Sequence, residues 1–377
     1  MGRFATVSDE RIKNGDCTDI YFLRTEKILD ATDRNPFVEM EVTASALPGG
    51  WGIFCGLDDV ISLLEDIPVS LEAMPEGSLF YQNEPIMRIS GYYRSFARYE
   101  TSILGFLCHA SGIATAAFQV KISARGKDIY SFGSRRQHPA IAAMVERSAL
   151  IGGVDGVSNV CSPPGIPLAG TMPHTFVMCY PTPEDAFRAF DLHAPEEVPR
   201  VMLCDTYCDE KRESISGAKA GASAVRLDTP RSRRGDMRAI LEEVRWELDA
   251  AGFGHVGIFL SGGITGRDVE RYRDIVDAFG VGGAIANAPV IDFGMDIVEI
   301  DGKKFAKRGK RSGIKQVYTL PTGERVTRPA GASMPQDACP LLKSYIHEGR
   351  AVSRPPMEEA RRRVLEQMEK MASCSFF

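Results

Sequence analysis

One short segment gathers cationic and aromatic side chains that could hold an anionic aromatic ligand. In Phe132-Gly133-Ser134-Arg135-Arg136-Gln137-His138-Pro139, two arginines and a histidine follow a phenylalanine at the end of an apolar run. Arginine forms paired hydrogen bonds with carboxylates, and aromatic rings pack against one another. A solvated surface loop would not need the aromatic residue. Phe132, Arg135, Arg136 and His138 are therefore candidate ligand-binding residues.

Carboxylates end two other apolar runs. Asp205 closes the run 201–205, and Asp228 closes the run 224–228. Alternate residues of a strand share a face, so Arg226 and Asp228 would set a cation and an anion on the same side. Carboxylates at the carboxyl ends of barrel strands suit ribose hydroxyls or Mg²⁺. The loop that follows is either part of this site or a solvated loop, and it carries Arg231, Arg233 and Arg234.

Two glycine pairs, Gly262-Gly263 after Ser261 and Gly282-Gly283 one βα unit later, could bind phosphate. Bare backbone N–H groups at the start of a helix can surround a phosphate, and barrels often place it after their last two strands. For either pair alone, a tight turn is the alternative. The match to G-x-G-x-x-G at 252–257 follows a helix and opens a strand, which is the reverse of a dinucleotide-binding motif.

A histidine stands near the expected start of a helix, in Gly170-Thr171-Met172-Pro173-His174. Imidazole can act as a general acid, a base or a nucleophile near neutral pH. Most lone histidines are structural, however, and residue type alone does not give His174 a role.

The pattern of elements changes along the chain. Between about residues 120 and 290, short apolar runs alternate with amphipathic stretches, which predicts parallel βα units in an α/β barrel or open sheet. Both flanking regions show turn residues between strand-like segments, with a helix at about 98–119 and a final helix after Pro355-Pro356. We expect an α+β domain formed from both chain ends, residues 1–120 plus 290–377, and a barrel domain at residues 121–289. The strands expected in the barrel are 129–133, 156–158, 201–205, 224–228, 256–262 and 283–287, with helices at 235–250 and 266–279.

Composition narrows the functional class. The 377 residues carry a net charge of −5 and a pI near 5.8, which argues against a nucleic-acid coat or a basic membrane-surface protein. Nine cysteines without a C-x-x-C spacing favour reduced thiols over a disulfide framework or a paired-cysteine zinc site. The first residues lack an apolar signal core, and the apolar stretch Ser102–Phe118 fits a buried helix. We expect a soluble, cytoplasmic protein.

Taken together, the segments resemble the nicotinate phosphoribosyltransferase family, among the type II phosphoribosyltransferases, in a compact prokaryotic form. The family's blocks occur in order across most of the chain. They are T-D-I-Y (18–21), F-G-S-R-R-Q-H-P (132–139), G-T-M-P-H (170–174), C-D-T-Y (204–207), V-R-L-D-T-P (225–230), S-G-G-I (261–264) and the pair Gly282-Gly283.

The resemblance implies an incomplete α/β barrel joined to an α+β domain, and transfer of phosphoribose from phosphoribosyl pyrophosphate to nicotinate in NAD biosynthesis. It implies Mg²⁺ bound with phosphoribosyl pyrophosphate, ATP as a co-substrate that phosphorylates His174, and a homodimer with shared sites or a higher oligomer. Phe132 would stack on the pyridine ring, with Tyr21 of the other protomer over its second face. Arg135, Arg136 and His138 would bind the nicotinate carboxylate or neighbouring phosphates. Arg226 and Asp228 would hold the base and the ribose, and Asp205 would act near the ribose or Mg²⁺. The 5-phosphate would be bound by Ser261, Gly262, Gly263, Gly282 and Gly283.

Several alternatives remain open. A quinolinate phosphoribosyltransferase of the same fold would use extra cations for a second carboxylate, which Arg135, Arg136 and His138 could supply. A nicotinamide-using enzyme would place an acid near the amide, and Asp155 is the candidate. A barrel that binds a phosphorylated sugar without catalysis would not need carboxylates at two strand ends. The chain departs from some short relatives in lacking a paired-cysteine zinc knuckle near its C-terminus, and its compact length puts ATP coupling in question.

Overall fold

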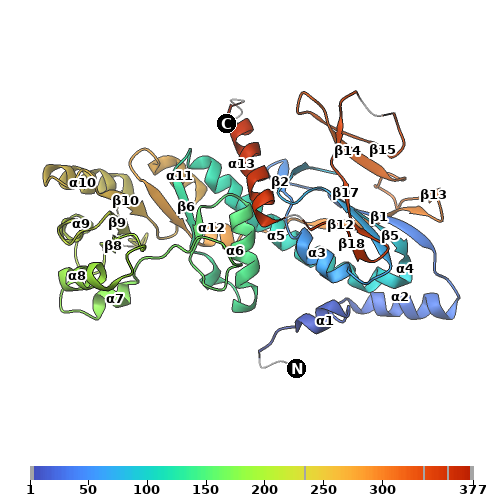
Figure 1. Ribbon diagram of the computed structural model, residues 1–377, viewed down its shortest axis with the longest axis horizontal. Coiled ribbons are helices and arrows are strands. Elements are labelled where there is room, and N and C mark those ends of the chain that lie inside the picture. The colour runs from blue at the N-terminus through green and yellow to red at the C-terminus, as the bar shows by residue number, and fades with distance from the viewer. Residues whose placement is uncertain (1–3, 233–234, 334–335, 355, 374–377) are drawn as a thin grey trace. The chain divides into compact units, whose positions relative to one another are not determined.

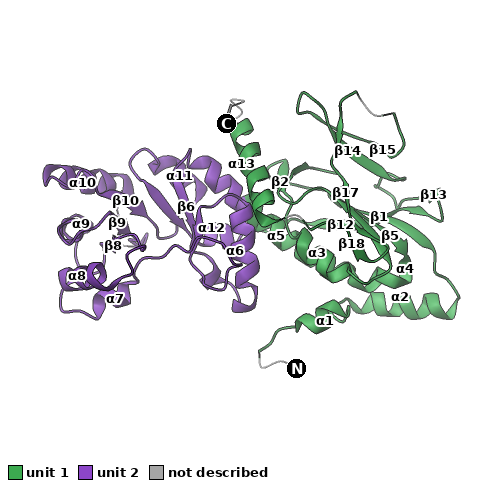
Figure 2. Ribbon diagram, in the orientation of Figure 1, with its two compact units in different colours: residues 1–115, 289–377 green, residues 116–288 purple. Residues whose placement is uncertain are grey.

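The computed structural model describes residues 4–232, 235–333, 336–354 and 356–373. The chain forms two compact units, unit 1 (residues 1–115 with 289–377) and unit 2 (residues 116–288), shown in Figure 2. The boundary at 115–116 falls inside one long helix, α5 (Glu100–Ser123), labelled in Figure 1. Unit 1 is therefore assembled from both ends of the chain, and unit 2 is a single continuous segment.

Unit 1 is built on a seven-stranded antiparallel sheet with the strand order β13-β12-β1-β5-β3-β17-β18. One of its pairs joins strands from the two ends of the chain, β1 (Phe37–Ala44) and β12 (Phe293–Ile300). Asp301 and Gly302 follow β12 with φ of 47° and 74°, the left-handed pair that a tight hairpin needs. The remaining strands are β3 (Val69–Ala73), β5 (Met87–Tyr92), β13 (Lys303–Lys304), β17 (Lys343–His347) and β18 (Arg350–Ala351).

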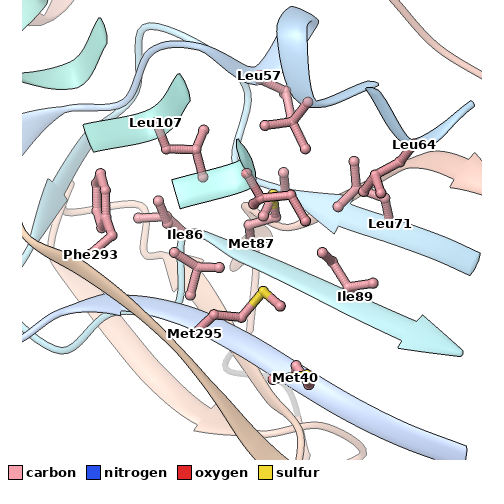
Figure 3. Packing of buried hydrophobic residues seen from close by; sticks show 14 of the residues in the cluster. Met40, Leu57, Leu64, Leu71, Ile86, Met87, Ile89, Leu107, Phe293 and Met295 are labelled. Carbon is pink, nitrogen blue, oxygen red and sulfur yellow. The ribbon is translucent and has the colours of Figure 1, made fainter. Parts of the chain in front are cut away.

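The apolar core of unit 1 lies between this sheet and two helices. Met40 and Met87 come from neighbouring strands and belong to the same buried cluster as Leu57 of α3 (Leu57–Leu64) and Leu107 of α5 (Figure 3). These side chains are at most 3% exposed. The cluster also contains Phe293 and Met295 from the C-terminal segment. Burying a side chain of this size stabilises a fold by about 1.5–3 kcal/mol, so the cluster helps to hold the two ends of the chain together.

Helix α5 is a core helix. The stretch Tyr93–Ser123 is long and apolar enough to cross a membrane by length and composition. Many of its apolar residues are nevertheless packed inside the protein, and Ile103, Leu107, Ile113 and Phe118 are fully buried. The buried helix expected at Ser102–Phe118 is therefore confirmed.

Smaller elements complete unit 1. A three-stranded antiparallel sheet has the order β15-β14-β16, and β2 pairs with β4. The strands are β2 (Trp51–Ile53), β4 (Leu79–Tyr81), β14 (Lys315–Thr319), β15 (Arg325–Pro329) and β16 (Cys339–Pro340). The helices are α1 (Asp9–Lys13), α2 (Ile20–Ala31), α4 (Tyr93–Phe96) and α13 (Met357–Ser373). Pro355, which was expected to open the last helix, lies outside the described residues.

Unit 2 is a curled, six-stranded parallel sheet with helices between its strands, a half-barrel. The strand order is β7-β6-β11-β10-β9-β8, so the two edge strands, β7 and β8, follow one another in the chain. The strands are β6 (Asp128–Ser131), β7 (Gly156–Val157), β8 (Val201–Leu203), β9 (Ala224–Leu227), β10 (Gly257–Leu260) and β11 (Ala278–Val281). The helices are α6 (Ala142–Ile151), α7 (His174–Met178), α8 (Pro183–His193), α9 (Glu210–Lys219), α10 (Met237–Ala250), α11 (Gly266–Tyr272) and α12 (Gly283–Ala286).

The last βα unit differs from the sequence expectation. Residues 283–287 were expected to form a strand, but they contain the short helix α12, and the strand is β11. The helix expected to run to residue 279 ends at Tyr272. Val276 and Phe279 continue the helical spacing by coincidence, because they are buried in the loop and the strand that follow. Gly282 and Gly283 consequently lie at the carboxyl end of β11.

Candidate active site

The parallel strands of unit 2 bring most of the candidate residues to one edge of the sheet. Phe132 directly follows β6, Asp228 follows β9, Ser261 follows β10 and Gly282 follows β11. Asp205 lies two residues after β8. In open α/β sheets and barrels, ligands bind at the carboxyl ends of the strands, and these residues all lie there.

Arg226 places a fixed cation at this edge. Its Nη1 donates a hydrogen bond to Thr171 Oγ1 (2.7 Å), and its Nη2 lies 3.6 Å from Asp228 Oδ2. Its guanidinium carbon lies 5.8 Å from the centre of the Phe132 ring, within range of a cation–π contact. The side chain is 13% exposed, and burial lowers the pKa of Arg226. Arginine keeps its charge in proteins even so, and the contacts hold that charge in one place.

Phe132 forms an aromatic surface beside this cation. Its ring stacks on Phe259, with 5.9 Å between the ring centres and 14° between their planes. Gly280 of β11 makes room for it, because a Cβ on Gly280 would lie 2.5 Å from Phe132 Cε2. The Phe132 side chain is half-buried. An aromatic ligand could pack on what remains exposed.

Asp205 is a half-buried acid with spare hydrogen-bonding capacity. Its Oδ2 accepts hydrogen bonds from Asp228 N–H (3.1 Å) and Thr229 Oγ1 (3.3 Å). Its Oδ1 is buried and accepts no hydrogen bond from the described residues. Burial raises the pKa of Asp205 to about 6, the nearby charge of Asp228 adds to this effect, and His174 opposes it. Such a carboxylate can accept a hydrogen bond from a ligand or contribute to a cation site.

His174 is the first residue of α7 and lies between two polar groups. Its Nδ1 is 3.2 Å from Thr206 Oγ1, and its Nε2 is 3.6 Å from Asp228 Oδ2. The side chain is 38% exposed, so a reagent in solution could reach it. Asp228 also accepts a hydrogen bond from Ser261 Oγ (2.9 Å) at Oδ1, and it links His174, Arg226 and Ser261 into one cluster.

The turn after β10 needs its glycines. Gly262 and Gly263 have φ of +86° and +71°, a conformation that favours glycine. A Cβ on Gly262 would also lie 2.7 Å from the backbone oxygen of Asp228. Within the described ranges, neither backbone N–H of this pair donates a hydrogen bond, which leaves both for an anion. The Gly282-Gly283 turn lies after the adjacent strand β11.

The loop after β6 holds the remaining cations. Arg135 and Arg136 are exposed on a short 3₁₀ turn, and the charge of Arg135 contributes to the lowered pKa of Arg226. Gln137 ties this loop to the end of α12 through Ala286 O (2.9 Å). His138 caps the next turn, because its Nδ1 accepts the N–H of Ala140 (3.2 Å). The structure thus gives His138 a local structural contact.

Asp155 is not brought to the cluster. It lies just before β7, at the amino end of the parallel strands, where its Oδ2 pairs with Lys121 Nζ (2.6 Å) and accepts the Ile129 N–H (2.8 Å). Tyr21 belongs to unit 1, on α2, where it is 55% exposed and its hydroxyl donates to Asp19 (3.3 Å).

Of the three arginines expected after β9, Arg233 and Arg234 lie outside the described residues. Arg231 is described, and its Nη2 donates to Gly263 O (3.2 Å) and lies 3.3 Å from Asp268 Oδ2.

Four hydrogen-bonding residues of the cluster were not assigned roles from the sequence. Thr171, Thr206 and Thr229 lie in segments that contain predicted site residues, but threonine is so common in loops that its presence alone does not indicate a role. Glu210 accepts the Thr229 hydroxyl (2.7 Å) from the first turn of α9, and no local pattern marks it. Among the residues the structure describes, no group of three or more histidine, cysteine or carboxylate side chains is arranged to hold a metal by itself.

Comparison with known proteins identifies the family. The quinolinate phosphoribosyl transferase N-terminal domain matches residues 19–111, and the C-terminal domain matches residues 113–296. A crystal structure of nicotinate-nucleotide pyrophosphorylase from Pyrococcus furiosus is 48% identical, covers 99% of both chains and has a TM-score of 0.96. The chain belongs to the nicotinate and quinolinate phosphoribosyltransferase family. Membership of this phosphoribosyltransferase family, which the sequence predicted, is confirmed.

Other members of this phosphoribosyltransferase family are more distant. Nicotinate phosphoribosyltransferase pncB2 of Mycobacterium tuberculosis is 31% identical over 77% of this chain and 66% of its own length. The Bacillus subtilis nicotinate phosphoribosyltransferase is 32% identical over 68% of this chain and 54% of its own. The chain thus spans less than two thirds of these curated relatives. Human nicotinic acid phosphoribosyltransferase shares the fold, with a TM-score of 0.78 at 21% identity.

Proposed function

We propose that this protein transfers the phosphoribosyl group of phosphoribosyl pyrophosphate to the ring nitrogen of nicotinate. The products would be nicotinate mononucleotide and pyrophosphate, in NAD biosynthesis. The observation that carries the proposal is Arg226, a mostly buried cation fixed beside the Phe132 ring and Asp228. Nicotinate is a flat aromatic anion, and this combination of a ring and a cation matches both of its properties.

The base would be held by Phe132 and the arginines. The pyridine ring would pack on Phe132, while Arg226 or the exposed Arg135 would bind its carboxylate. This arrangement leaves the lone pair of the ring nitrogen free to form the new bond. Because the Arg226 side chain is already bonded and mostly buried, little conformational entropy would be lost when the base binds.

The acids would act on the sugar. In the transfer, the bond from ribose C1 to the pyrophosphate oxygen breaks with its electron pair on the oxygen, and the lone pair of the ring nitrogen forms the new bond to C1. The sugar carries positive charge on the way, which the carboxylates of Asp205 and Asp228 would stabilise. The free Oδ1 of Asp205 would also accept a hydrogen bond from a ribose hydroxyl.

The side chains present fit Mg²⁺ that arrives with its substrate. This ion is usually held by one or two carboxylates together with substrate phosphates, not by an all-protein cage. Asp205, with a buried oxygen that has no partner in the described chain, and Asp228 meet that requirement. When bound, the metal would neutralise charge on the leaving pyrophosphate. The glycine turns at 262–263 and 282–283 would bind the 5-phosphate through their N–H groups.

Two further parts of the proposal concern ATP and the partner subunit. His174 is half-exposed beside Asp228, and we propose that ATP phosphorylates it and so couples ATP hydrolysis to the transfer. We also propose a homodimer in which Tyr21 of one protomer covers the base bound to the other. The exposure of Tyr21 on α2 supports its availability to a second chain.

The test is a substrate comparison. Purified protein is incubated with phosphoribosyl pyrophosphate, Mg²⁺ and each of nicotinate, quinolinate and nicotinamide, and mononucleotide is measured by chromatography. Nicotinate should give the highest kcat/KM. Turnover of quinolinate with no turnover of nicotinate would overturn the proposal.

A quinolinate-using enzyme is the second candidate. It is favoured by Arg135 and Arg136, which are exposed on the turn beside Arg226 and would supply cations for a second carboxylate. The two candidates differ in their products, because quinolinate transfer releases CO₂ and nicotinate transfer does not. The nicotinamide alternative rested on Asp155, which is engaged with Lys121 at the opposite end of the strands.

A further inference from the structure

A buried glutamate behind the site is bonded to three successive backbone amides. Glu213 lies on α9 and is 1% exposed. Its Oε2 accepts the N–H of Thr206 (2.8 Å), and its Oε1 accepts the N–H groups of Tyr207 (2.7 Å) and Cys208 (2.9 Å). These three residues form the turn that follows Asp205.

This arrangement fixes the shape of the turn. Consecutive N–H groups that converge on one point form an anion-binding concavity, and here the protein's own carboxylate occupies it. Hydrogen bonds to a charged acceptor are roughly twice as strong as those between neutral groups. A buried carboxylate is costly unless such bonds satisfy it, so the turn and Glu213 depend on each other.

The same turn positions the chemistry of the site. Thr206 donates its N–H to Glu213, and its hydroxyl lies 3.2 Å from His174 Nδ1. Asp205, the preceding residue, is also linked to α9 through Thr229, whose Oγ1 lies 2.7 Å from Glu210 Oε1 and 3.3 Å from Asp205 Oδ2. Helix α9 therefore supports the neighbourhood of Asp205 and His174 through two separate carboxylates, Glu210 and Glu213.

We propose that Glu213 is a positioning residue for the phosphoribosyl transfer proposed above. It contacts no substrate, and it acts by holding the Asp205–Cys208 turn in the conformation that aims Asp205 at the ribose and Thr206 at His174. The inference rests on the proposed function for the reaction, while its structural part concerns the turn alone. The base-binding side chain Phe132 and the arginines at 135 and 136 lie on the other loop, after β6, and do not depend on Glu213.

Glu213→Gln is the sharpest change. The glutamine side chain has nearly the same size but replaces one acceptor oxygen with an NH₂ donor. If its oxygen stays with Tyr207 and Cys208, the new NH₂ group faces the N–H of Thr206, and that hydrogen bond is lost. Ser216→Ala is the matched control, because Ser216 lies on the same helix as Glu213 and its change removes a hydrogen bond from Ser216 Oγ to Glu184 of α8 (2.6 Å) without touching the turn.

Two measurements are made on both variants and the wild-type protein. Hydrogen–deuterium exchange of peptides spanning residues 204–210 should speed up in Glu213→Gln and stay at the wild-type rate in Ser216→Ala. In steady-state assays, kcat/KM for phosphoribosyl pyrophosphate should fall by about 10- to 100-fold in Glu213→Gln, on the scale of an active group misplaced by about 1 Å. The KM for nicotinate should stay within about threefold of wild type, since Phe132 and Arg135 follow β6, Arg226 lies on β9, and none of them is bonded to Glu213.

Several outcomes would overturn the role of Glu213. The first is wild-type kinetics in Glu213→Gln. The second is an equal loss of kcat/KM in Ser216→Ala when the two variants have the same melting temperature. The third is a KM for nicotinate that rises in Glu213→Gln as much as kcat/KM for phosphoribosyl pyrophosphate falls. If Glu213→Gln does not accumulate as folded protein, Glu213→Asp, which keeps both oxygens but shortens the side chain by one methylene, is judged by the same criteria. A wild-type protein inactive with nicotinate, quinolinate and nicotinamide would instead overturn the proposed function.

Discussion

The half-buried acid Asp205 should make the protein less stable at neutral pH than it would be with a neutral side chain at that position. Its pKa is about 6 in the folded protein, against an ordinary value of 3.8. Below both values the carboxyl is protonated in the folded and unfolded chains and has no effect. As the pH rises, the unfolded chain releases its proton first, and the fold loses stability until the pH passes 6. Asp205→Asn removes the titrating group.

The size of the effect follows from the two pKa values. A pKa difference of about two corresponds to about 3 kcal/mol, which is the full penalty expected near pH 8. At pH 4.5, which lies between the two pKa values, the carboxyl is mostly ionised in the unfolded chain and mostly protonated in the folded protein. Only part of the penalty is present there, and the same relation gives about 1 kcal/mol. The substitution should therefore stabilise the protein by about 2 kcal/mol more at pH 8 than at pH 4.5. Changes in packing or neutral hydrogen bonds cancel in this comparison.

The assay is thermal unfolding of the wild-type and Asp205→Asn proteins at both pH values. For a folding unit of about 170 residues, 2 kcal/mol corresponds to a difference of roughly 4–8 °C in the Tm change. Glu196→Gln, which removes an exposed carboxyl of the same unit, is the control and should show no such difference. Transfer activity should be lost in Asp205→Asn at every pH, so stability and activity should move in opposite directions.

Equal Tm changes at pH 8 and pH 4.5 would refute the reasoning. A second check uses Asp228, whose negative charge helps raise the pKa of Asp205. Asp228→Asn removes that charge, so the pH range over which Asp205 destabilises the fold should move to lower pH. An unchanged range would show that the two carboxylates do not interact.

Three further predictions concern the proposed reaction. His174→Ala should abolish ATP stimulation and leave basal transfer, and stimulation that persists would remove His174 from its proposed role. Gly280→Ala sets a Cβ 2.5 Å from the Phe132 ring and should raise the KM for nicotinate on the order of tenfold, so an unchanged KM would argue against base stacking on Phe132. Mixing inactive Tyr21→Ala and Arg226→Ala proteins should restore some activity, and no recovery would count against a shared site.

The sequence was most informative where periodic patterns and strand ends coincide. Arg226 and Asp228 were expected on the same side of a strand, and their side chains lie 3.6 Å apart. His174 was expected near a helix start and is the first residue of α7. These placements follow from local geometry, because the alternation of side chains along a strand and the residues that start a helix produce recognisable sequence patterns.

The parts that could not be predicted depend on contacts between segments distant in sequence. The helical spacing of Val276 and Phe279 concealed the end of α11, since tertiary packing and not a local stop signal ends that helix. Asp155 resembled a site residue by position alone, and only its contacts with Lys121 and Ile129 show where it lies. Glu213 is a glutamate in an ordinary polar helix, and nothing but the fold shows that three amides converge on it.

The seven-stranded sheet of unit 1 combines strands from both ends of the chain, and this has a consequence for the synthesis of the protein. Strands β1 and β3 both pair with β5, but the second neighbour of β1 is β12, more than 200 residues later, and the second neighbour of β3 is β17, at residues 343–347. While the chain leaves the ribosome, the edges of β1 and β3 stay unpaired until the last quarter has been made, and unpaired edges are where chains associate wrongly. Unit 2 is continuous and can fold earlier. Premature termination before residue 293 would therefore leave a complete half-barrel attached to a sheet that lacks four of its seven strands.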